Sequence, residues 1–233
     1  MDGANLKPFL NFYGSKWRIA PKYPRPKYLT LIEPFAGAAG YSIRHYNLNV
    51  NLYDVDPIIV GVWDYLIKAS PKEIRELPAD VLSVRDINVC QEAKWLIGFW
   101  LVRGRSSPGL SLSKWGRNEK WRSLFWGEKI RERIATQVPY IKHWKVYHKS
   151  YDRISNRLAT WFIDPPYLDG GEHYTHSNID YGHLGSWCKE RKGMAIVCER
   201  YGADWLEFKE FERTHSTLSD KSYMEAVWVN SND

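Results

Sequence analysis

Strand-like and helix-like segments alternate in the first third of the sequence, and this alternation restricts the possible folds most. YLTLIEPF (28–35) and NVNLYDVD (49–56) have the apolar character of buried strands. AGAAGYSIRHY (36–46) is a Gly-rich turn that opens a helix, and PIIVGVWDYLIKA (57–69) is a helix with Pro57 in its first turn. Because strands that alternate with helices are usually parallel neighbours, this order predicts a parallel α/β sheet.

The sheet pattern stops near residue 85 and resumes near residue 145. In between, the sequence predicts a helix over 90–104, a loop rich in Ser, Gly and basic residues over 105–120, and mainly helix over 123–144; a short amphipathic helix over 71–78 precedes them. Further strands are expected in 145–151, 158–164, 193–199 and 224–230. We therefore expect a sheet domain formed by residues 1–84 and 145–233, with residues 85–144 as an inserted region.

Positive charge is concentrated in and around this insertion. Residues 94–149 contain 13 Lys or Arg residues and three acids, a formal charge of +10 in a chain whose total is +6. Six of the 12 tryptophans also lie there. A basic segment interleaved with aromatic residues is typical of a nucleic-acid-binding surface. A solvated basic face and tryptophans packed in a core explain the same composition equally well.

Other patterns argue against several classes of protein. No run of 18 apolar residues occurs and MDGANLKPF is no signal peptide, so we expect neither a membrane span nor export. The three cysteines (Cys90, Cys188 and Cys198) are odd in number and widely spaced, which favours a reducing cytoplasm over a disulfide framework. The seven histidines form no HxH or HExxH pattern, so we expect no metal. No G-x-S-x-G pattern supports a hydrolase.

The turn after the first strand, EPFAGAAG (33–40), and the acid after the second strand predict a cofactor site. Glycines let the backbone turn sharply and bring a ligand close to a helix N-terminus. The turn lacks the full G-x-G-x-x-G, so a dinucleotide phosphate fits poorly. Asp54 ends the second strand, where a carboxylate can accept hydrogen bonds from both hydroxyls of a ribose. Together they indicate a nucleoside-bearing cofactor.

The apolar strand 158–163 is followed at once by Asp164, Pro165, Pro166 and Tyr167. Proline lacks an N–H and restricts φ, so the strand must end here and present a carboxylate and an aromatic ring. The N6 amine of adenine is a poor nucleophile because its lone pair is delocalised into the ring. Asp164 and the Pro165 carbonyl can each accept a hydrogen bond from one of the two N6 protons. These hydrogen bonds stabilise the positive charge that develops on nitrogen during the reaction. Tyr167 can stack on a base that has left the duplex.

In this order, NFYGSKWR (11–18), EPFAGAAG, YDVD (53–56) and IDPPY (163–167) resemble the motifs of DNA adenine-N6 methyltransferases. The resemblance is to the D12 or DNA adenine methylase class, of the α group, including its small phage-encoded members. It covers the sheet domain and is weakest in the insertion. It implies a Rossmann-like S-adenosylmethionine-dependent methyltransferase sheet with a basic, mainly helical insertion that recognises the target. It also implies the cytoplasm of a bacterial or phage-infected cell, and a monomer would suffice.

The resemblance assigns roles by position. Phe12, Tyr13 and Lys16 would hold the methionine end of the cofactor, with Lys16 facing its carboxylate. Glu33, Phe35, Ala36, Gly37 and Gly40 would line the cofactor, and Asp54 would bind its ribose. Tyr151 and Asp152 would lie at the cofactor's adenine. The family often has the acid just before the aromatic residue, where this chain has Ser150.

Basic and aromatic residues of the insertion are the candidate DNA contacts: Arg103, Arg105, Lys114, Trp115, Arg117 and Arg122. Phosphate contacts would provide affinity and salt dependence, and contacts to base edges would provide sequence choice. The sequence does not divide the candidates between these two classes. His173, Tyr174 and Asn178, on the loop after the proline turn, could clamp a flipped base or simply form a solvated loop.

The predicted function is transfer of a methyl group from S-adenosylmethionine to N6 of adenine in double-stranded DNA, with base flipping. Adenine-N6 methylation of RNA stays open. So does cytosine-N4 methylation of DNA, although the family then more often has Ser in place of Asp164. A DNA-binding protein that keeps the fold without catalysis is the third alternative.

Overall fold

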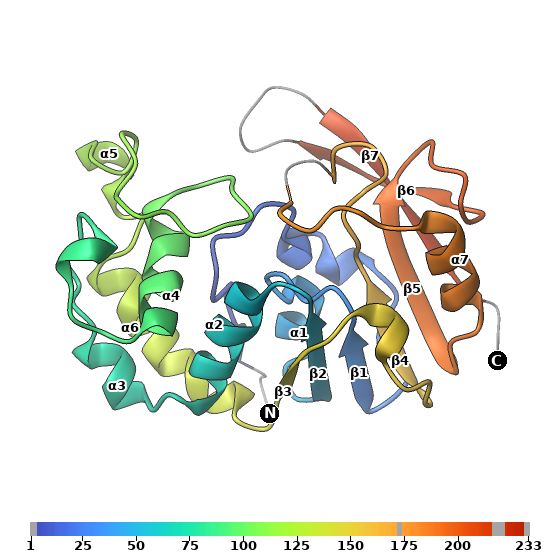
Figure 1. The fold of residues 1–233 in the computed structure, drawn as a ribbon, viewed down its shortest axis with the longest axis horizontal. Coiled ribbons are helices and arrows are strands. Elements are labelled where there is room, and N and C mark those ends of the chain that lie inside the picture. The colour runs from blue at the N-terminus through green and yellow to red at the C-terminus, as the bar shows by residue number, and fades with distance from the viewer. Residues whose placement is uncertain (1–3, 172–173, 216–221, 231–233) are drawn as a thin grey trace.

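One mixed β-sheet forms the centre of the molecule (Figure 1). The computed structural model of the chain describes residues 4–171, 174–215 and 222–230. Within these residues seven strands share one sheet in the order β3-β2-β1-β4-β5-β7-β6. Their bounds are β1 Thr30–Glu33, β2 Asn49–Asp54, β3 Lys145–His148, β4 Ala159–Ile163, β5 Gly193–Arg200, β6 Lys209–His215 and β7 Ser222–Val229. The first five are parallel, and β7 runs antiparallel between β5 and β6. The α/β sheet predicted from the sequence is thereby confirmed.

The direction in which the chain adds strands reverses between β1 and β4. The chain places β2 and β3 on one side of β1, and β4 and β5 on the other side. In open α/β sheets, ligands bind outside the carboxyl ends of the strands at such a reversal. Glu33 ends β1 and Asp164 follows β4, so the fold brings these two acids to the same edge of the sheet.

The α-helices of the described residues are α1 Gly40–Arg44, α2 Pro57–Lys68, α3 Pro71–Glu76, α4 Gln91–Leu101, α5 Glu119–Arg122, α6 Glu128–Gln137 and α7 Tyr181–Lys189. Local capping explains where several begin. The Asp56 side chain accepts the Ile58 N–H at the start of α2, and Ser70 and Glu73 form a capping box at the start of α3. Among the described residues, no helix has the length and apolarity that crossing a bilayer requires.

Three elements, α5, α7 and β6, lie outside those expected from the sequence, and α5 is a single turn in and beyond the expected loop 105–120. The helix α7 contains Gly182 and Gly185, which weaken helix propensity, but Asp180 caps it by accepting the His183 N–H at 2.9 Å. The strand β6, KEFERTH, is at the edge of the sheet and is largely charged. Edge strands commonly carry charge because it discourages pairing with other chains. That charge hides the strand pattern in the sequence.

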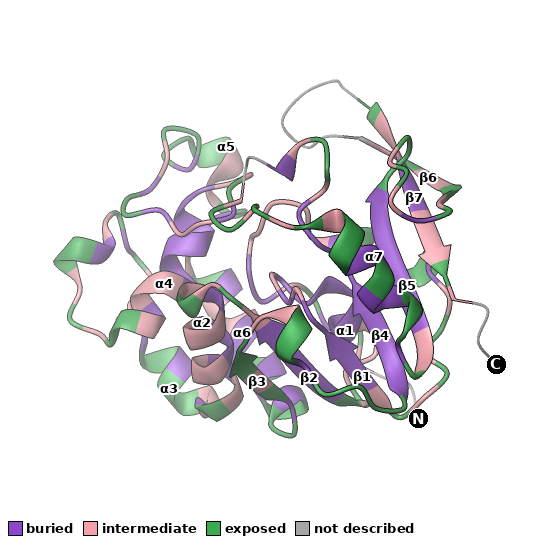
Figure 2. Cartoon of the chain, turned by 45° about the vertical axis from the view of Figure 1, so that its right-hand side comes forward, coloured by how far each residue is buried: buried purple, intermediate pink, exposed green. Residues whose placement is uncertain are grey.

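Alternate residues of the central strands enter two apolar cores, one on each face of the sheet (Figure 2). Leu31 and Phe162 pack in the core that includes α1, α2, α4 and α6. Ile32 and Trp161 pack in the core that includes α7. With apolar partners on both faces, all five residues of β4 are buried. This explains the continuous apolar run before the proline turn.

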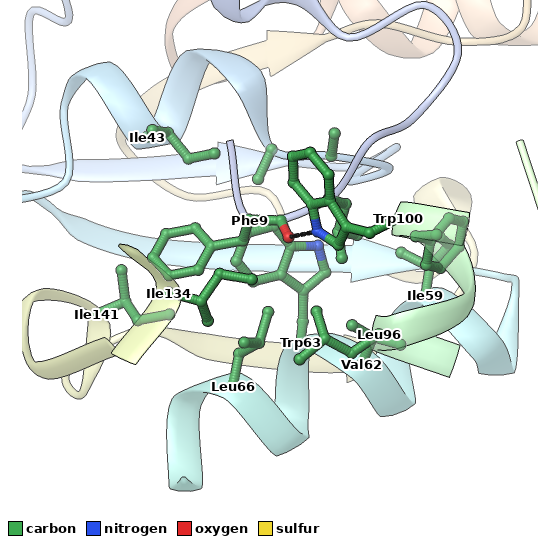
Figure 3. Close-up of a cluster of buried hydrophobic side chains, with 14 of the residues drawn as sticks. Phe9, Ile43, Ile59, Val62, Trp63, Leu66, Leu96, Trp100, Ile134 and Ile141 are labelled. Carbon is green, nitrogen blue, oxygen red and sulfur yellow. Dashed lines mark hydrogen bonds between the residues drawn. The ribbon is translucent and has the colours of Figure 1, made fainter. Parts of the chain in front are cut away.

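The helices between β2 and β3 share the first of these cores. Figure 3 shows Trp63 of α2 beside Trp100 of α4 and Ile134 of α6, with Phe9 of the N-terminal segment among them. The Trp100 indole donates a hydrogen bond to the Phe9 carbonyl at 2.8 Å, which satisfies the only polar group of that buried ring. The N-terminal segment is therefore fixed between the sheet and the inserted helices.

Candidate active site

A cavity of about 440 Å³ lies at the carboxyl edge of the sheet, where the strand order reverses. Its volume is in the range of pockets that bind cofactors and small ligands. Several segments line it, with residues 12–16, 33, 35–40, 54–56, 59, 106, 150–151, 162, 164, 166 and 174–179. Of the site residues predicted from the sequence, it is lined by Phe12, Tyr13, Lys16, Glu33, Phe35, Ala36, Gly37, Gly40, Asp54, Tyr151, Asp164 and Pro166. The structure thus gathers residues from distant parts of the sequence into one cavity.

Asp54 ties the end of β2 to the Gly-rich turn. Its carboxylate accepts the Gly37 N–H at 3.0 Å through Oδ2 and the Asp56 N–H at 2.9 Å through Oδ1. Burial raises the pKa of Asp54 to about 6, and the two amides oppose that rise. Gly37 has a left-handed φ of 43°, and a Cβ there would lie 3.1 Å from the Phe12 ring. Glycine is needed for this turn, which holds the carboxylate at the cavity wall.

The start of α1 is packed against the one-turn helix η1 (Lys16–Arg18). A Cβ on Gly40 would lie 2.5 Å from the Trp17 nitrogen and 3.0 Å from the Lys16 backbone, so only glycine permits this approach. The preceding Ala39 has φ 48° and ψ 43°, and no other non-glycine residue of the described ranges has a positive φ. Such a conformation costs about 1–2 kcal/mol. Strain of this kind often accompanies functional sites, and Ala39 lines the cavity.

Glu33 is a buried carboxyl group at the end of β1. It is 2% exposed, and its Oε1 accepts the Ser42 N–H of α1 at 2.7 Å. Burial raises the pKa of Glu33 to about 8, although the Ser42 contact opposes the rise. At neutral pH Glu33 is therefore mainly protonated, which reduces the negative charge at this edge of the sheet.

An ion pair joins Lys16 of η1 to Asp164, the residue that follows β4. The distance from Nζ to Oδ1 is 2.8 Å, and the side chains are 6% and 19% exposed. Burial alone would lower the pKa of Lys16, but the carboxylates of Asp164 and Glu225 raise it well above its usual value. Burial raises the pKa of Asp164, and the Lys16 ammonium opposes that rise. The resemblance implies that Lys16 faces the cofactor's carboxylate; in the structure its ammonium contacts Asp164, and both residues line the cavity.

Tyr167 continues this network away from Asp164. Its hydroxyl donates a hydrogen bond to Oε2 of Glu225 on β7, a residue that is 1% exposed. The Lys16 ammonium lies 4.7 Å from the centroid of the Tyr167 ring. One face of the ring is therefore covered by Lys16, and a base would have to stack on the other face.

The proline turn is anchored on α7. The Tyr181 hydroxyl donates to the Pro166 carbonyl at 2.7 Å. Neither Pro165 nor Tyr167 lines the cavity, whereas their neighbours Asp164 and Pro166 do.

An aromatic pair forms the wall near β3. The rings of Phe35 and Tyr151 have centroids 5.4 Å apart, and the Tyr151 hydroxyl shares a hydrogen bond of 2.8 Å with Nδ1 of His183. Ser150 lines the cavity beside Tyr151. Asp152 is exposed and does not line the cavity, because it lies one residue further along a one-turn helix. The structure therefore brings Tyr151 to the site and leaves Asp152 outside it.

Two loops complete the cavity. Residues 174–179, after the proline turn, form one wall, and the Tyr174 ring packs against Tyr13 with centroids 5.8 Å apart. Of the clamp candidates on this loop, Tyr174 and Asn178 line the cavity, and His173 lies outside the described residues. Ser106 of the insertion also lines the cavity. The adjacent Arg105 carbonyl accepts the Tyr13 N–H at 3.0 Å, so the insertion directly supports the site.

The predicted DNA contacts occupy different environments. Lys114 and Arg117 are exposed, and Trp115 is 54% exposed, with its ring stacked on Trp121 at 5.8 Å between centroids. Arg105 is also exposed. This loop and α5 lie at the same edge of the molecule as the carboxyl ends of the parallel strands (Figure 1). An exposed basic and aromatic surface thus adjoins the loop that reaches the cavity at Ser106.

Arg103 and Arg122 are less available to a ligand. Arg122 donates to the Trp126 carbonyl and pairs with Asp80 at 3.6 Å, so it stabilises the helical region itself. Arg103 is half-buried, and burial lowers its pKa with a further contribution from the charge of Arg18.

The sequence patterns do not identify several residues of this site. Glu225 is an acid inside the apolar run MEAVWVN, and a charge in a buried strand is a usable signal that it has a partner. Tyr174 and Asn178 of the wall 174–179 were candidates from the sequence, but Ser106, Ser150, Thr175 and Ser177 show no comparable signal. Small polar residues on loops are common everywhere, so only the tertiary arrangement identifies these.

No protein-family model matches the sequence, and no curated protein gives a significant match. Among similar solved structures is a proposed methyltransferase of Escherichia coli, yhhF, with 9% identity over 97% of this chain and 96% of that chain and a TM-score of 0.41. The rRNA methyltransferase aviRa of Streptomyces viridochromogenes has 14% identity over 97% of this chain and 87% of its own, with a TM-score of 0.39. A proposed methylase of Haemophilus influenzae has 10% identity over 90% and 91%, with a TM-score of 0.34. Such weak likenesses carry no argument about what this chain does.

The strand order and its connections therefore define the fold. The strand order reverses between β1 and β4, a Gly-rich turn follows β1, an acid ends β2, and β7 runs antiparallel between β5 and β6. This is a Rossmann-like arrangement, an open α/β sheet with a reversal of strand order at which ligands bind. The expected fold class is confirmed, with a basic, mainly helical insertion between α3 and β3.

Proposed function

We propose that this chain transfers a methyl group from S-adenosylmethionine to N6 of adenine in DNA. The observation that carries the proposal is the place of Asp164, which follows β4 at the reversal of strand order and lines the same cavity as Asp54. An acceptor for an exocyclic amine and an acceptor for a ribose thus share one cavity of about 440 Å³. The Gly-rich turn lies between them in the cavity wall.

The residues present fit S-adenosylmethionine. Asp54 supplies the acceptor that ribose hydroxyls require, and the paired rings of Phe35 and Tyr151 supply an apolar surface for an adenine. Phe12 and Tyr13 would adjoin the methionine part. When bound, the cofactor supplies a methyl group already activated on a positively charged sulfur. The protein therefore has to bind and orient an amine.

Asp164 and the Pro165 carbonyl would perform that task. Asp164 can accept a hydrogen bond from one N6 proton through Oδ2 while Oδ1 keeps its contact with Lys16. The Pro165 carbonyl can accept a hydrogen bond from the other N6 proton. Both contacts stabilise the positive charge that develops on nitrogen as it attacks. Once methylated, N6 carries a surplus proton, and the Asp164 carboxylate is placed to take it. Tyr167 would hold the base by stacking on the face that Lys16 does not cover.

The exposed surface at Lys114, Trp115 and Arg117 supports a nucleic acid as the carrier of the adenine. Lysine and arginine can neutralise phosphates, and an exposed indole can stack on a base. Because Asp164 lies in a cavity at the carboxyl edge of the sheet and is 19% exposed, adenine in duplex DNA would have to leave the base stack to reach it.

The test is methyl transfer from labelled S-adenosylmethionine to unmethylated duplex DNA, followed by nucleoside mass spectrometry, with Asp164→Ala as the negative control. N6-methyladenine in the DNA supports the proposal. Product found only in RNA, or only as N4-methylcytosine, replaces the substrate with one of the two alternatives. If no nucleic acid is modified and the cofactor does not bind, the chain is a binding protein that has this fold without catalysis.

A further inference from the structure

A buried carboxylate lies behind the proline turn and has no part in the proposed reaction. Glu225 is in the middle of β7 and is 1% exposed, between residues that pack in an apolar core. Burying a carboxylate is unfavourable unless it is paired and hydrogen-bonded, and an apolar residue of similar volume often folds as well or better. A gain in folding stability therefore does not explain why β7 has a glutamate at position 225. The contacts that Glu225 makes are the better explanation.

Those contacts form an unbroken chain to Asp164. Glu225 accepts a hydrogen bond from the Tyr167 hydroxyl, and the Tyr167 ring lies 4.7 Å from the Lys16 ammonium. That ammonium in turn lies 2.8 Å from Oδ1 of Asp164. Four side chains from three separate segments, η1, the proline turn and β7, thus define one another's positions.

In this set of four side chains, one cation faces two carboxylates. Lys16 is attracted by two carboxylates, those of Asp164 and Glu225. The titratable groups that interact electrostatically with Glu225 are Lys16, Tyr167, Asp164, Tyr223, Tyr23 and Cys198. Its register partners on the adjacent strands are Arg200 of β5, which is exposed, and Glu212 of β6. Among the interacting groups, Lys16 is the cation. A negative Glu225 therefore draws part of the Lys16 charge away from Asp164, which keeps Asp164 a better acceptor for an amine.

From this geometry we infer that Glu225 is a positioning residue, which orients the Tyr167 ring and divides the Lys16 ammonium between two carboxylates. The inference rests on the proposed function, because it assigns Glu225 an effect on the reaction at Asp164. Glu225 itself would touch neither the cofactor nor the base.

A second buried glutamate provides the matched control. Glu199, on the neighbouring strand β5, is fully buried and accepts the Trp205 indole N–H at 2.9 Å, the Arg200 N–H at 2.7 Å and the Leu168 N–H at 3.3 Å. Among the described contacts it has no hydrogen bond to the side chain of Tyr167 or Lys16. Any loss that Glu199→Gln and Glu225→Gln share therefore does not depend on the Tyr167 hydroxyl.

The kinetic test compares Glu225→Gln with wild type and with Glu199→Gln. In Glu225→Gln the amide oxygen can still accept from the Tyr167 hydroxyl but carries no charge, and we expect kcat to fall about 10-fold, because a hydrogen bond to a charged group is roughly twice as strong as one between neutral groups. We expect cofactor affinity to change less than twofold, since Glu225 does not line the cavity. The acid limb of the kcat profile should move to lower pH, because removing a nearby negative charge eases the ionisation of Asp164. An unchanged kcat and pH profile, or an equal loss in Glu199→Gln, would overturn the inference.

A second measurement needs no activity and separates the inference from the proposed function. Urea unfolding of Tyr167→Phe, Glu225→Gln and the double variant forms a double-mutant cycle. If the two side chains act as a unit, the double variant loses less in its urea midpoint than the two single losses combined. Additive losses would overturn the inference even if wild type methylates DNA. Should wild type transfer no methyl group at all, the proposed function fails and this cycle alone decides whether Glu225 positions Tyr167.

Discussion

The ammonium of Lys16 lies 2.8 Å from Oδ1 of Asp164, so a one-turn helix near the N-terminus meets the residue that ends the central strand β4. Gly40 makes the contact possible, because its missing Cβ lets the backbone of Lys16 and Trp17 approach α1. Both members of the pair are largely buried. Removing either one leaves the other as an uncompensated charge.

Lys16→Met is expected to destabilise the protein by about 3–5 kcal/mol, the usual cost of breaking a buried ion pair. The double variant Lys16→Met/Asp164→Asn should lose less than Lys16→Met alone, because it leaves one fewer buried carboxylate without a cation. Urea unfolding at neutral pH measures both. A double variant that is less stable than Lys16→Met would show that the pair contributes nothing as a pair.

Asp164→Ala is expected to lower kcat for methyl transfer at least 100-fold, the scale of losing one contact that stabilises charge in the transition state (about 2.7–4 kcal/mol). Binding of S-adenosylmethionine, measured by calorimetry, should survive, because Asp54 and the Gly-rich turn are intact. Equal loss of binding and transfer would rule out the specific role given to Asp164.

Stability should fall as pH rises, with Glu33 as one identifiable cause. Its pKa is about 8 in the folded protein, above its usual value of 4.5, so the folded state holds the proton more tightly than the unfolded state. The contribution of Glu33 is complete below pH 4.5, decreases as pH rises, and is lost above about pH 8. The loss is on the order of 4 kcal/mol.

Glu33→Gln tests this assignment, since glutamine keeps an acceptor for the Ser42 N–H without a titrating group. Urea unfolding at pH 5, 7 and 8.5 should show that the variant loses less stability than wild type across this range. Parallel curves for the two proteins would contradict a raised pKa at Glu33.

Gly40→Ala is expected to cost about 1–3 kcal/mol, because its Cβ would meet the backbone of Trp17 at 2.5 Å and force η1 away from α1. Displacing η1 should also weaken the Lys16–Asp164 contact and lower activity. Gly182→Ala on α7 is the control, since its Cβ would meet only Asp180 Oδ1 at an ordinary 3.4 Å. Thermal unfolding should find this control as stable as wild type or slightly more so. Equal effects of the two substitutions would exclude a special role for the approach at Gly40.

Trp115→Ala should weaken DNA binding while stability changes by less than about 0.5 kcal/mol, as is usual for exposed positions. Loss of one stacked base corresponds to about 1–3 kcal/mol in binding. Lys114→Ala should instead reduce the slope of log affinity against log salt by about one unit. Lys72→Ala on α3, at the opposite edge of the molecule from α5 (Figure 1), is the control for charge alone. Binding that responds equally to all three would place the DNA surface elsewhere.

Several structural elements were predictable because their signals are local. Pro57 after Asp56 predicts the start of α2, and the helix begins there. The proline pair after Ile163 predicts the end of β4, which the structure confirms. The edge strand β6 was not predicted. Its charged residues discourage pairing with other chains, and they also hide the alternation of apolar residues by which strands are predicted. The position of Asp152 was also not predictable. It is next to Tyr151 in the sequence, but the one-turn helix there leaves Asp152 exposed and outside the cavity.

By itself the sequence determined the fold class, the Gly-rich turn, and the positions of Asp54 and Asp164 at strand ends. These features depend on apolar periodicity and on proline, whose effects are confined to residues close together in the sequence. Only the tertiary structure decided that Lys16 pairs with Asp164 and that Glu225 holds Tyr167. These groups lie far apart in the chain, and their ionisation depends on shared burial and on charges contributed by other strands. No local pattern encodes that environment. It arises when β1, β4, β5 and β7 are brought side by side in one sheet, and that juxtaposition exists only in the folded protein.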